Sequence, residues 1–147
     1  MKAFSLIILS ALLVFTNTSV ATAAENLRYD APISRSSLER LKQFTSAAME
    51  STLDAYDVAG TDLNDDGLDE FILKSKTCDQ KCRFAVVAEN NRKIIPLVSI
   101  EAANVVLGNE FEHGVRNLLV FENPNNDFDY VLYTWHPLSS TYKKAGL

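Results

Sequence analysis

The chain has 147 residues, a formal net charge of −5 and two cysteines. This length suits one domain and hardly two. With 47% apolar and 22% charged residues, the composition excludes a disordered acidic tail and a membrane bundle. The acidic balance also argues against nucleic-acid binding, because phosphate recognition needs a basic stripe on the protein.

Residues 1–24 have the order of a secretory signal peptide. A short positive start is followed by an apolar run from Ala3 to Phe15 and then by small residues. This run is shorter than the roughly 20 residues that a membrane span needs. We therefore expect cleavage before Ala24 or Glu25, and a mature protein that has no membrane span and is periplasmic or secreted.

The segment after the signal peptide predicts an arm and then a helix. Residues 25–35 show no hydrophobic period, so we expect a flexible N-terminal arm ahead of a single domain, residues 36–147. Ser36 and Glu39 fit a capping box, and the following pattern predicts an amphipathic helix from Ser37 to Ala55. Its apolar positions recur at steps of three and four residues: Leu38, Leu41, Phe44 and Ala48.

Beyond the helix the hydrophobic period changes to two, and turn residues separate the apolar runs. The main strand candidates are Phe71–Leu73, Phe84–Ala88, Ile94–Ile100, Val115–Phe121 and Phe128–Trp135. Pro96 predicts that its strand lies at a sheet edge or breaks there. Residues 102–114 fit either a short helix or another strand. The predicted fold class is α+β, with one N-terminal amphipathic helix packed on an antiparallel meander sheet of about five to seven strands.

The most specific motif is the acidic turn, which we define as Asp62–Glu70. Oxygen-bearing side chains stand at its positions 1, 3, 5 and 9, and a glycine stands at position 6. This pattern can surround a hard cation, with one backbone carbonyl added. The candidate calcium ligands are Asp62, Asn64, Asp66, Leu68 and Glu70. A β-turn without any ion is the alternative, because Asx residues and glycine stabilise such turns themselves.

The expected calcium site is structural and weak. Position 12, where an EF-hand has a bidentate glutamate, is Leu73, and a strand rather than a helix follows the turn. The motif is therefore not an EF-hand, and we expect a dissociation constant on the order of 10⁻⁴–10⁻³ M, as in extracellular modules.

The segment from Asp62 to Leu73 resembles the calcium loop of FG-GAP and VCBS-type repeats, Asp-x-Asn-x-Asp-Gly-x-x-(Asp/Glu) followed by an apolar strand. Asp65 stands where those repeats often have glycine. The repeats build a propeller from many copies, whereas this chain has one clear copy. Together with the cysteine-bracketed turn that follows, the unit also resembles small exported bacterial proteins of no assigned activity. The resemblance implies four side-chain ligands: Asp62, Asn64, Asp66 and Glu70.

Cys78 and Cys82 lie between two strand candidates. Export places them in an oxidising compartment, so we expect a disulfide that closes a hairpin loop. Free thiols and a zinc site are the alternatives. A zinc site needs two further ligands, and His113 and His136 are the only imidazoles in the chain.

Aromatic residues crowd the C-terminal segment. Alternation places Val131, Tyr133 and Trp135 on one strand face and Phe128, Tyr130 and Leu132 on the other. One face must pack on the core, while an aromatic face in solvent is typical of binding surfaces. The candidate binding surface consists of Tyr130, Tyr133, Trp135 and Tyr142. A central strand buried on both faces is the alternative.

No nucleophile elbow, zinc-protease motif or phosphate loop occurs in the sequence. The leading hypothesis is an exported, non-enzymatic binding protein of the inhibitor or immunity type, whose partner is a protein in the cell envelope. The excess of acidic residues favours a basic partner. One alternative is a calcium-stabilised structural or adhesion-type module. The other is a small hydrolase in which His113, beside Glu112, acts as general base.

Overall fold

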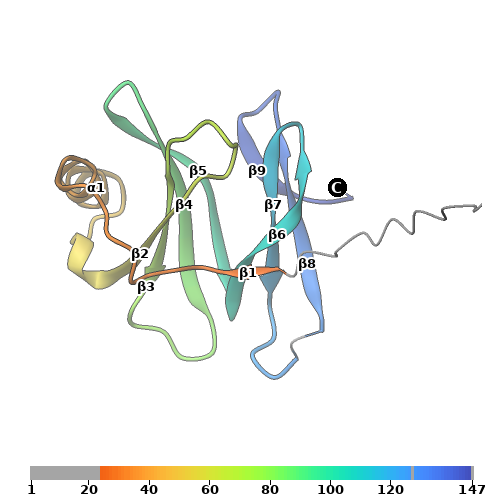
Figure 1. The fold of residues 1–147 in the computed structure, drawn as a ribbon. Helices are drawn as coiled ribbons and strands as arrows, with labels where there is room; N and C mark the ends of the chain where they lie inside the picture. Colours follow the sequence, from red (N-terminus) through yellow and green to blue (C-terminus); the bar gives the residue numbers. More distant parts are fainter. Residues whose placement is uncertain (1–23, 127, 147) are drawn as a thin grey trace, which may run out of the picture.

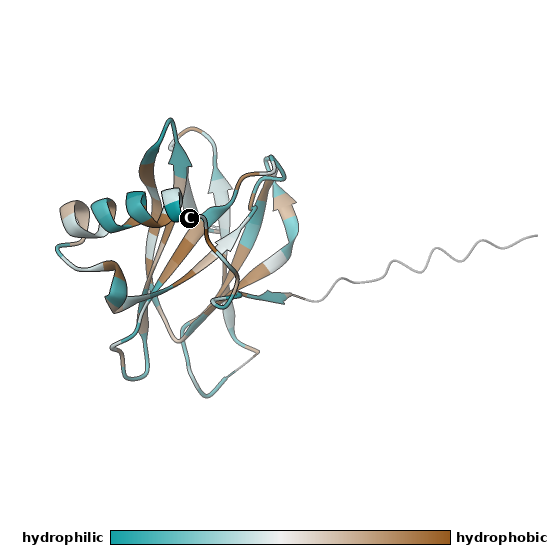
Figure 2. Ribbon diagram, turned by 60° about the vertical axis from the view of Figure 1, so that its left-hand side comes forward, coloured by the Kyte–Doolittle hydropathy of each residue, from teal (hydrophilic) through white to brown (hydrophobic). Residues whose placement is uncertain are grey.

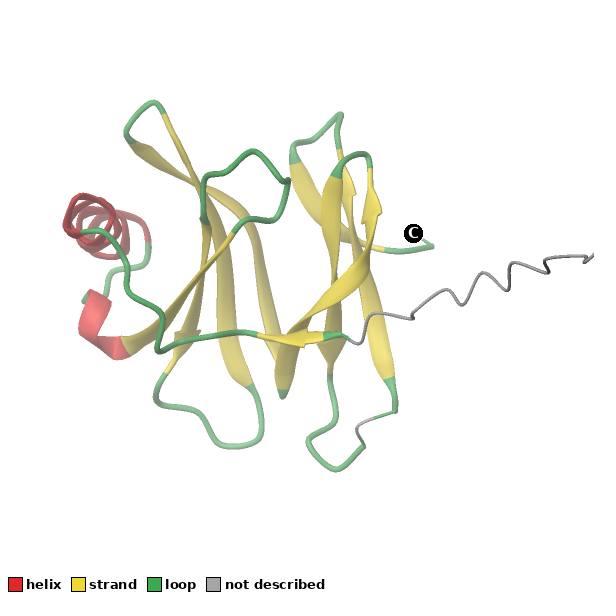
Figure 3. Ribbon diagram, viewed as in Figure 1, coloured by secondary structure: helices red, strands yellow, loops and turns green. Residues whose placement is uncertain are grey.

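The computed structural model describes residues 24–126 and 128–146. One helix, a four-stranded sheet and a five-stranded sheet form three layers that lie side by side, from left to right in Figures 1 and 3. The expected signal peptide lies outside the described residues, except for Ala24. Within the described ranges, no helix is both long enough and apolar enough to cross a membrane.

The elements follow one another in a simple order. They are β1 (Glu25–Asn26), α1 (Arg35–Ala48), the 3₁₀ helix η1 (Leu53–Ala55), β2 (Tyr56–Thr61), β3 (Glu70–Ser75), β4 (Cys82–Asn90), β5 (Lys93–Ala102), β6 (Asn104–Glu112), β7 (Val115–Phe121), β8 (Tyr130–His136) and β9 (Thr141–Lys144). The first sheet has the order β2-β3-β4-β5, and the second has the order β1-β6-β7-β8-β9. All pairs are antiparallel. The predicted combination of antiparallel sheet and one helix is confirmed.

The prediction of one sheet with five to seven strands is wrong. Nine described strands form two sheets, and the chain passes from the first to the second at Ala103. The ambiguous segment 102–114 contains β6, and residues 25–26 of the predicted arm pair with β6 as β1. Alternation shows that a segment is a strand with two different faces, but it does not show to which sheet the strand belongs. Pro96 lies in β5, an edge strand, opposite a register shift in β4, as its missing N–H requires.

The helix begins earlier than the predicted Ser37–Ala55. Its N-cap is Ser34 rather than Ser36, because the Oγ of Ser34 accepts a hydrogen bond of 3.1 Å from the backbone N–H of Ser37. Glu39 takes no part in a capping box and instead forms an exposed ion pair with a lysine one turn later. Several serines in a row make the cap position ambiguous in the sequence.

The helix also ends earlier than predicted, at Ala48. The N–H groups of Met49 and Ser51 both donate to the carbonyl of Thr45. Between them, Glu50 has a φ of 50°, the left-handed conformation that closes helices. The apolar period continues past this point into η1, which is why the sequence predicts a longer helix.

Two hydrophobic cores separate the three layers (Figure 2). The core between the sheets contains Leu63, Ile72, Cys82, Phe84, Val86, Leu97, Ile100, Ala102, Val105, Leu107, Leu118, Val120 and Tyr142. The core between α1 and the first sheet contains Leu41, Leu53, Phe71, Leu73, Ala85 and Val87. Successive residues of β3 and β4 point alternately into the two cores, so these strands are apolar on both faces. The first sheet is therefore the central layer of the molecule.

The predicted disulfide between Cys78 and Cys82 is confirmed, and it closes the loop between β3 and β4. The two residues are separated by four positions in the sequence. Cys82 is buried at the start of β4 and belongs to the core between the sheets. The bridge therefore fixes the loop at one end of the sandwich.

Replacing both Cys78 and Cys82 with serine should lower the free energy of unfolding by about 2 kcal/mol, the chain-entropy value for so short a loop. Urea unfolding followed by circular dichroism measures the change. Reduced wild-type protein, the matched control, should unfold close to the double variant. Equal stability of the oxidised wild type and the variant would contradict the stabilising role.

Candidate functional site

The acidic turn connects β2 to β3 and is held by its own side chains. Asp62 accepts backbone N–H groups at both carboxylate oxygens: Oδ1 accepts from Asn64 at 3.3 Å and from Asp66 at 3.2 Å, and Oδ2 accepts from Gly67 at 2.8 Å. Further along, Oδ1 of Asp66 accepts from the N–H of Leu68 at 2.8 Å. These bonds satisfy backbone donors that the chain reversal removes from the sheet ladder.

Two residues of the turn have left-handed backbone conformations. Asp65 has a φ of 56° and Gly67 has a φ of 82°. Glycine adopts this region without steric cost, and aspartate is among the residues that tolerate it. The departure from glycine at position 65 therefore leaves the conformation of the turn accessible.

Glu70 ends the turn and is only 7% exposed. Its Oε2 accepts the backbone N–H of Leu63 at 2.8 Å, and its Oε1 accepts from the amide of Asn64 at 3.4 Å. The pKa of the Glu70 carboxyl is raised to about 7. Burial is the main cause, the charges of Asp66 and Asp62 add to it, and the hydrogen bond from Leu63 opposes it. This buried carboxyl therefore changes protonation near neutral pH.

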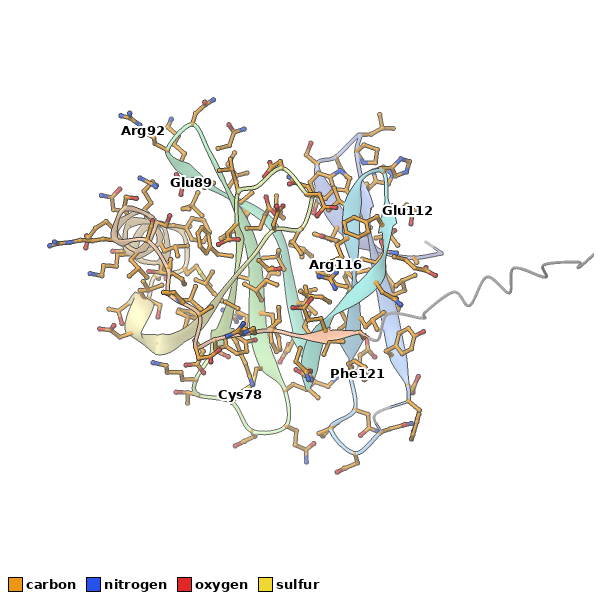
Figure 4. All side chains as sticks on the ribbon, viewed as in Figure 1. Cys78, Glu89, Arg92, Glu112, Arg116 and Phe121 are labelled. Atoms are coloured by element: carbon orange, nitrogen blue, oxygen red, sulfur yellow. A yellow bond between two sulfur atoms is a disulfide. The ribbon has the colours of Figure 1, made fainter. Side chains whose placement is uncertain are left out.

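A series of hydrogen bonds joins the turn to the second sheet. Leu63 is fully buried between the sheets, and its carbonyl accepts the backbone N–H of Arg116 in β7 at 2.7 Å. The guanidinium of Arg116, labelled in Figure 4, donates from Nη1 to Glu25 in β1 at 3.0 Å and from Nε to the carbonyl of Gly108 in β6. The hydroxyl of Tyr142 in β9 donates to the carbonyl of Arg116 at 2.7 Å. The turn is thus anchored to Arg116 of β7, which is itself bonded to β1, β6 and β9 of the same sheet.

The structure brings the predicted calcium ligands into a single turn, where several of their oxygens bond backbone N–H groups. Within residues 24–126 and 128–146, no three His, Cys, Asp or Glu side chains form a group that could hold a metal ion. Calcium binding therefore stays a prediction. The predicted ligand set is Asp62, Asn64, Asp66 and Glu70 through their side chains and Leu68 through its carbonyl.

The predicted aromatic surface is wrong for Tyr142, which is 2% exposed inside the core between the sheets. Tyr133 and Trp135 pack against that core and are only partly exposed. The Trp135 and Tyr142 rings meet edge to face, with their centroids 5.6 Å apart. Tyr130, half exposed on the outer face of β8, is the most exposed of the four. Alternation identifies the two faces correctly, but it does not say which face is covered.

The candidate general base lies in a hairpin turn. His113 has a φ of 52° between β6 and β7, and its Nε2 lies 4.0 Å from the nearest carboxylate oxygen of Glu112. Both side chains are about half exposed. In the β8–β9 turn, Nδ1 of His136 lies 3.1 Å from the hydroxyl of Ser139.

Sequence reasoning considered only the carbonyl of Leu68, whereas the structure shows that its side chain is exposed. Leu68 is 65% exposed at the tip of the acidic turn, where its neighbours Asp65, Asp66 and Asp69 are also exposed. Beside the tip lies a groove of about 440 Å³ that reaches the start of α1. The sequence signal for this position is an apolar residue that lies between Gly67 and Asp69 in the acidic half of the turn.

No protein-family model, curated protein or solved structure matches the chain. The resemblance of Asp62–Leu73 to FG-GAP and VCBS-type loops thus stays a prediction from the motif alone. The function must be inferred from the geometry of the described residues.

Stability should fall as the pH rises through the titration of Glu70. Its folded pKa of about 7 lies above the ordinary glutamate pKa of 4.5, so the folded protein binds this proton more tightly than the unfolded chain. The corresponding stability is complete below pH 4.5, is lost between there and about pH 7, and amounts to about 3 kcal/mol. Urea unfolding in chelator across this range measures the slope.

Comparison of the variants Glu70→Gln and Glu110→Gln tests whether the buried carboxyl of Glu70 causes the pH dependence of stability. Glu70→Gln should remove most of the slope, whereas the exposed control Glu110→Gln should keep it. A slope that survives Glu70→Gln would mean that another group causes the pH dependence. The charged groups that act on Glu70 are Asp66 and Asp62, and the neutral hydroxyl of Tyr142 lies near it.

Proposed function

We propose that the chain is an exported, non-enzymatic binding protein of the inhibitor or immunity type, and that the acidic turn contacts its partner. One observation supports this most directly: an exposed leucine lies at the tip of a turn that five bonds from side-chain oxygens to backbone N–H groups fix in place. A single exposed leucine is common on protein surfaces, so the fixed conformation of the turn and the carboxylates around Leu68 carry the proposal.

Rigidity of the turn favours tight binding. A flexible loop loses conformational freedom when it binds, whereas a loop held in one conformation has already lost it on folding. The anchor of Leu63 between the sheets extends this rigidity from the turn to the body of the protein. The partner therefore meets a preformed surface.

The charge of the turn specifies the partner's chemistry. Carboxylates of Asp65, Asp66 and Asp69 are exposed around Leu68, and the whole chain is acidic. Opposite charges accelerate association and set orientation more than they add affinity. The fitting partner is a protein of the cell envelope with an apolar pocket bordered by lysine or arginine.

Leu68→Asp should abolish capture of this partner by the tagged mature protein from an envelope fraction. The change removes the apolar anchor, while the exposure of Leu68 leaves folding unaffected. Leu138→Asp is the matched control, because Leu138 is 94% exposed in the β8–β9 turn. Equal loss in both variants, or retention in both, would contradict the assignment of the acidic turn as the contact.

A calcium-stabilised module is the second candidate function. Three carboxylates and one amide offer hard oxygen donors within one turn, and Asp65 and Gly67 have the backbone conformations that let the chain bend there. Calcium prefers such donors and accepts irregular coordination. In this function Asp62, Asn64, Asp66 and Glu70 hold the ion, and the ion fixes the turn.

If calcium binds, about 5 mM of it should stabilise the protein by about 1–2 kcal/mol relative to chelator, as mass action requires for a millimolar to submillimolar site. Thermal melting with calcium, magnesium and chelator measures this. Asp66→Asn should remove most of the gain, whereas Asp79→Asn in the disulfide loop should keep it. Identical melting temperatures in calcium and in chelator would show that the turn does not bind calcium.

A further inference from the structure

A cleft of about 620 Å³ lies at the end of the sandwich away from the acidic turn. In Figure 1 the acidic turn joins the tops of β2 and β3, and the β7–β8 loop lies at the bottom; Figure 4 labels Phe121 at that lower end. The cleft is lined by β1, the β5–β6 connection, the start of the β7–β8 loop and the side chain of Lys74. It is therefore separate from the surface proposed above.

The charge of this cleft is opposite to that of the protein. The chain has 19 acidic residues, yet no described Asp or Glu lines the cleft. Lys74 is half-buried, and its ammonium lies 5.9 Å and 6.0 Å from the ring centroids of Tyr29 and Phe84. Its cross-strand neighbour Asp57 instead contacts Lys76, at 3.9 Å. Lys74 thus lacks an ion-pair partner among the described residues, which favours an anionic ligand.

Amide groups and an aromatic ring complete the lining. Oδ1 of Asn104 accepts from the N–H of Val105, and Oδ1 of Asn123 accepts from the N–H of Asn125. In the described part of the chain, neither amide NH₂ group donates a hydrogen bond, so both are available to ligand oxygens. The Phe121 ring lines the same cleft and contacts the Tyr130 ring at 5.9 Å. A hydroxyl-rich ring with one apolar face matches these groups.

Ala24 also lines the cleft, at the expected cleavage position of the signal peptide. Cleavage before Ala24 would place a new α-amino group there. An α-amino group is largely protonated at neutral pH and adds a second positive charge beside Lys74. Removal of the signal peptide would therefore add the second positive charge to the cleft.

We propose that this cleft binds an acidic sugar, with its carboxylate at Lys74 and the new N-terminus, its hydroxyls at Asn104 and Asn123, and its ring against Phe121. The ligand is thus a uronic acid or an oligosaccharide that contains one. Neutral sugars lack the charge, and simple anions lack the hydroxyls and the apolar face.

Titration calorimetry of glucuronate into mature protein that begins at Ala24 tests the proposal. Glucuronate should bind at least tenfold more tightly than glucose, acetate or inorganic phosphate. Equal binding of phosphate or acetate would reduce the cleft to a general anion site and overturn the sugar assignment, and absence of glucuronate binding would overturn the proposal altogether.

Two variants test whether glucuronate binds in this cleft. Lys74→Gln should weaken glucuronate binding at least tenfold, whereas Lys76→Gln, two positions along and outside the cleft, should leave it unchanged. Asn104→Ala, at an exposed position, should weaken binding without affecting the fold. A chain with extra residues before Ala24 should bind several-fold more weakly. Unchanged binding in both Lys74→Gln and Asn104→Ala would show that the sugar binds elsewhere.

Discussion

The hydrogen bond from the N–H of Arg116 to the carbonyl of Leu63 joins a turn of the first sheet to a strand of the second. The N–H of Leu63 donates to the carboxylate of Glu70, and the Leu63 side chain is buried between the sheets. Both backbone groups of Leu63 are thus satisfied inside the protein, which a buried turn residue requires. The position of the acidic turn depends on this arrangement.

A fixed turn explains why acidic groups and an apolar tip can coexist in one short segment. Asp62 uses its carboxylate to bond backbone N–H groups, which leaves Asp65, Asp69 and Leu68 free to face solvent. The same arrangement keeps Glu70 away from water and raises its pKa toward neutrality. One local structure therefore explains three features of the turn. These are the bond from Leu63 to the second sheet, the exposed side chain of Leu68 and the buried carboxyl of Glu70.

Local patterns predicted the local features of this protein well. The disulfide between Cys78 and Cys82 and the edge position of Pro96 followed from chemistry that acts within a few residues. The division into two sheets did not, because a strand such as β6 has the same alternation in either sheet. For the same reason Tyr142 was expected on the surface: its burial depends on β9 folding back beside β8, which no sequence period reveals.

Amide hydrogen exchange in chelator near pH 6 tests the anchored turn most directly. Leu63 and Arg116 should exchange as slowly as Ile72 and Val120 in the core, since the N–H of Arg116 is released only when the turn leaves the second sheet, and the N–H of Leu63 only when the buried carboxylate of Glu70 lets it go. Fast exchange at Leu63 and Arg116, at the rate of an exposed hairpin residue such as Asn91, with the core still protected, would contradict the account. The turn would then open on its own and could not serve as a preformed surface.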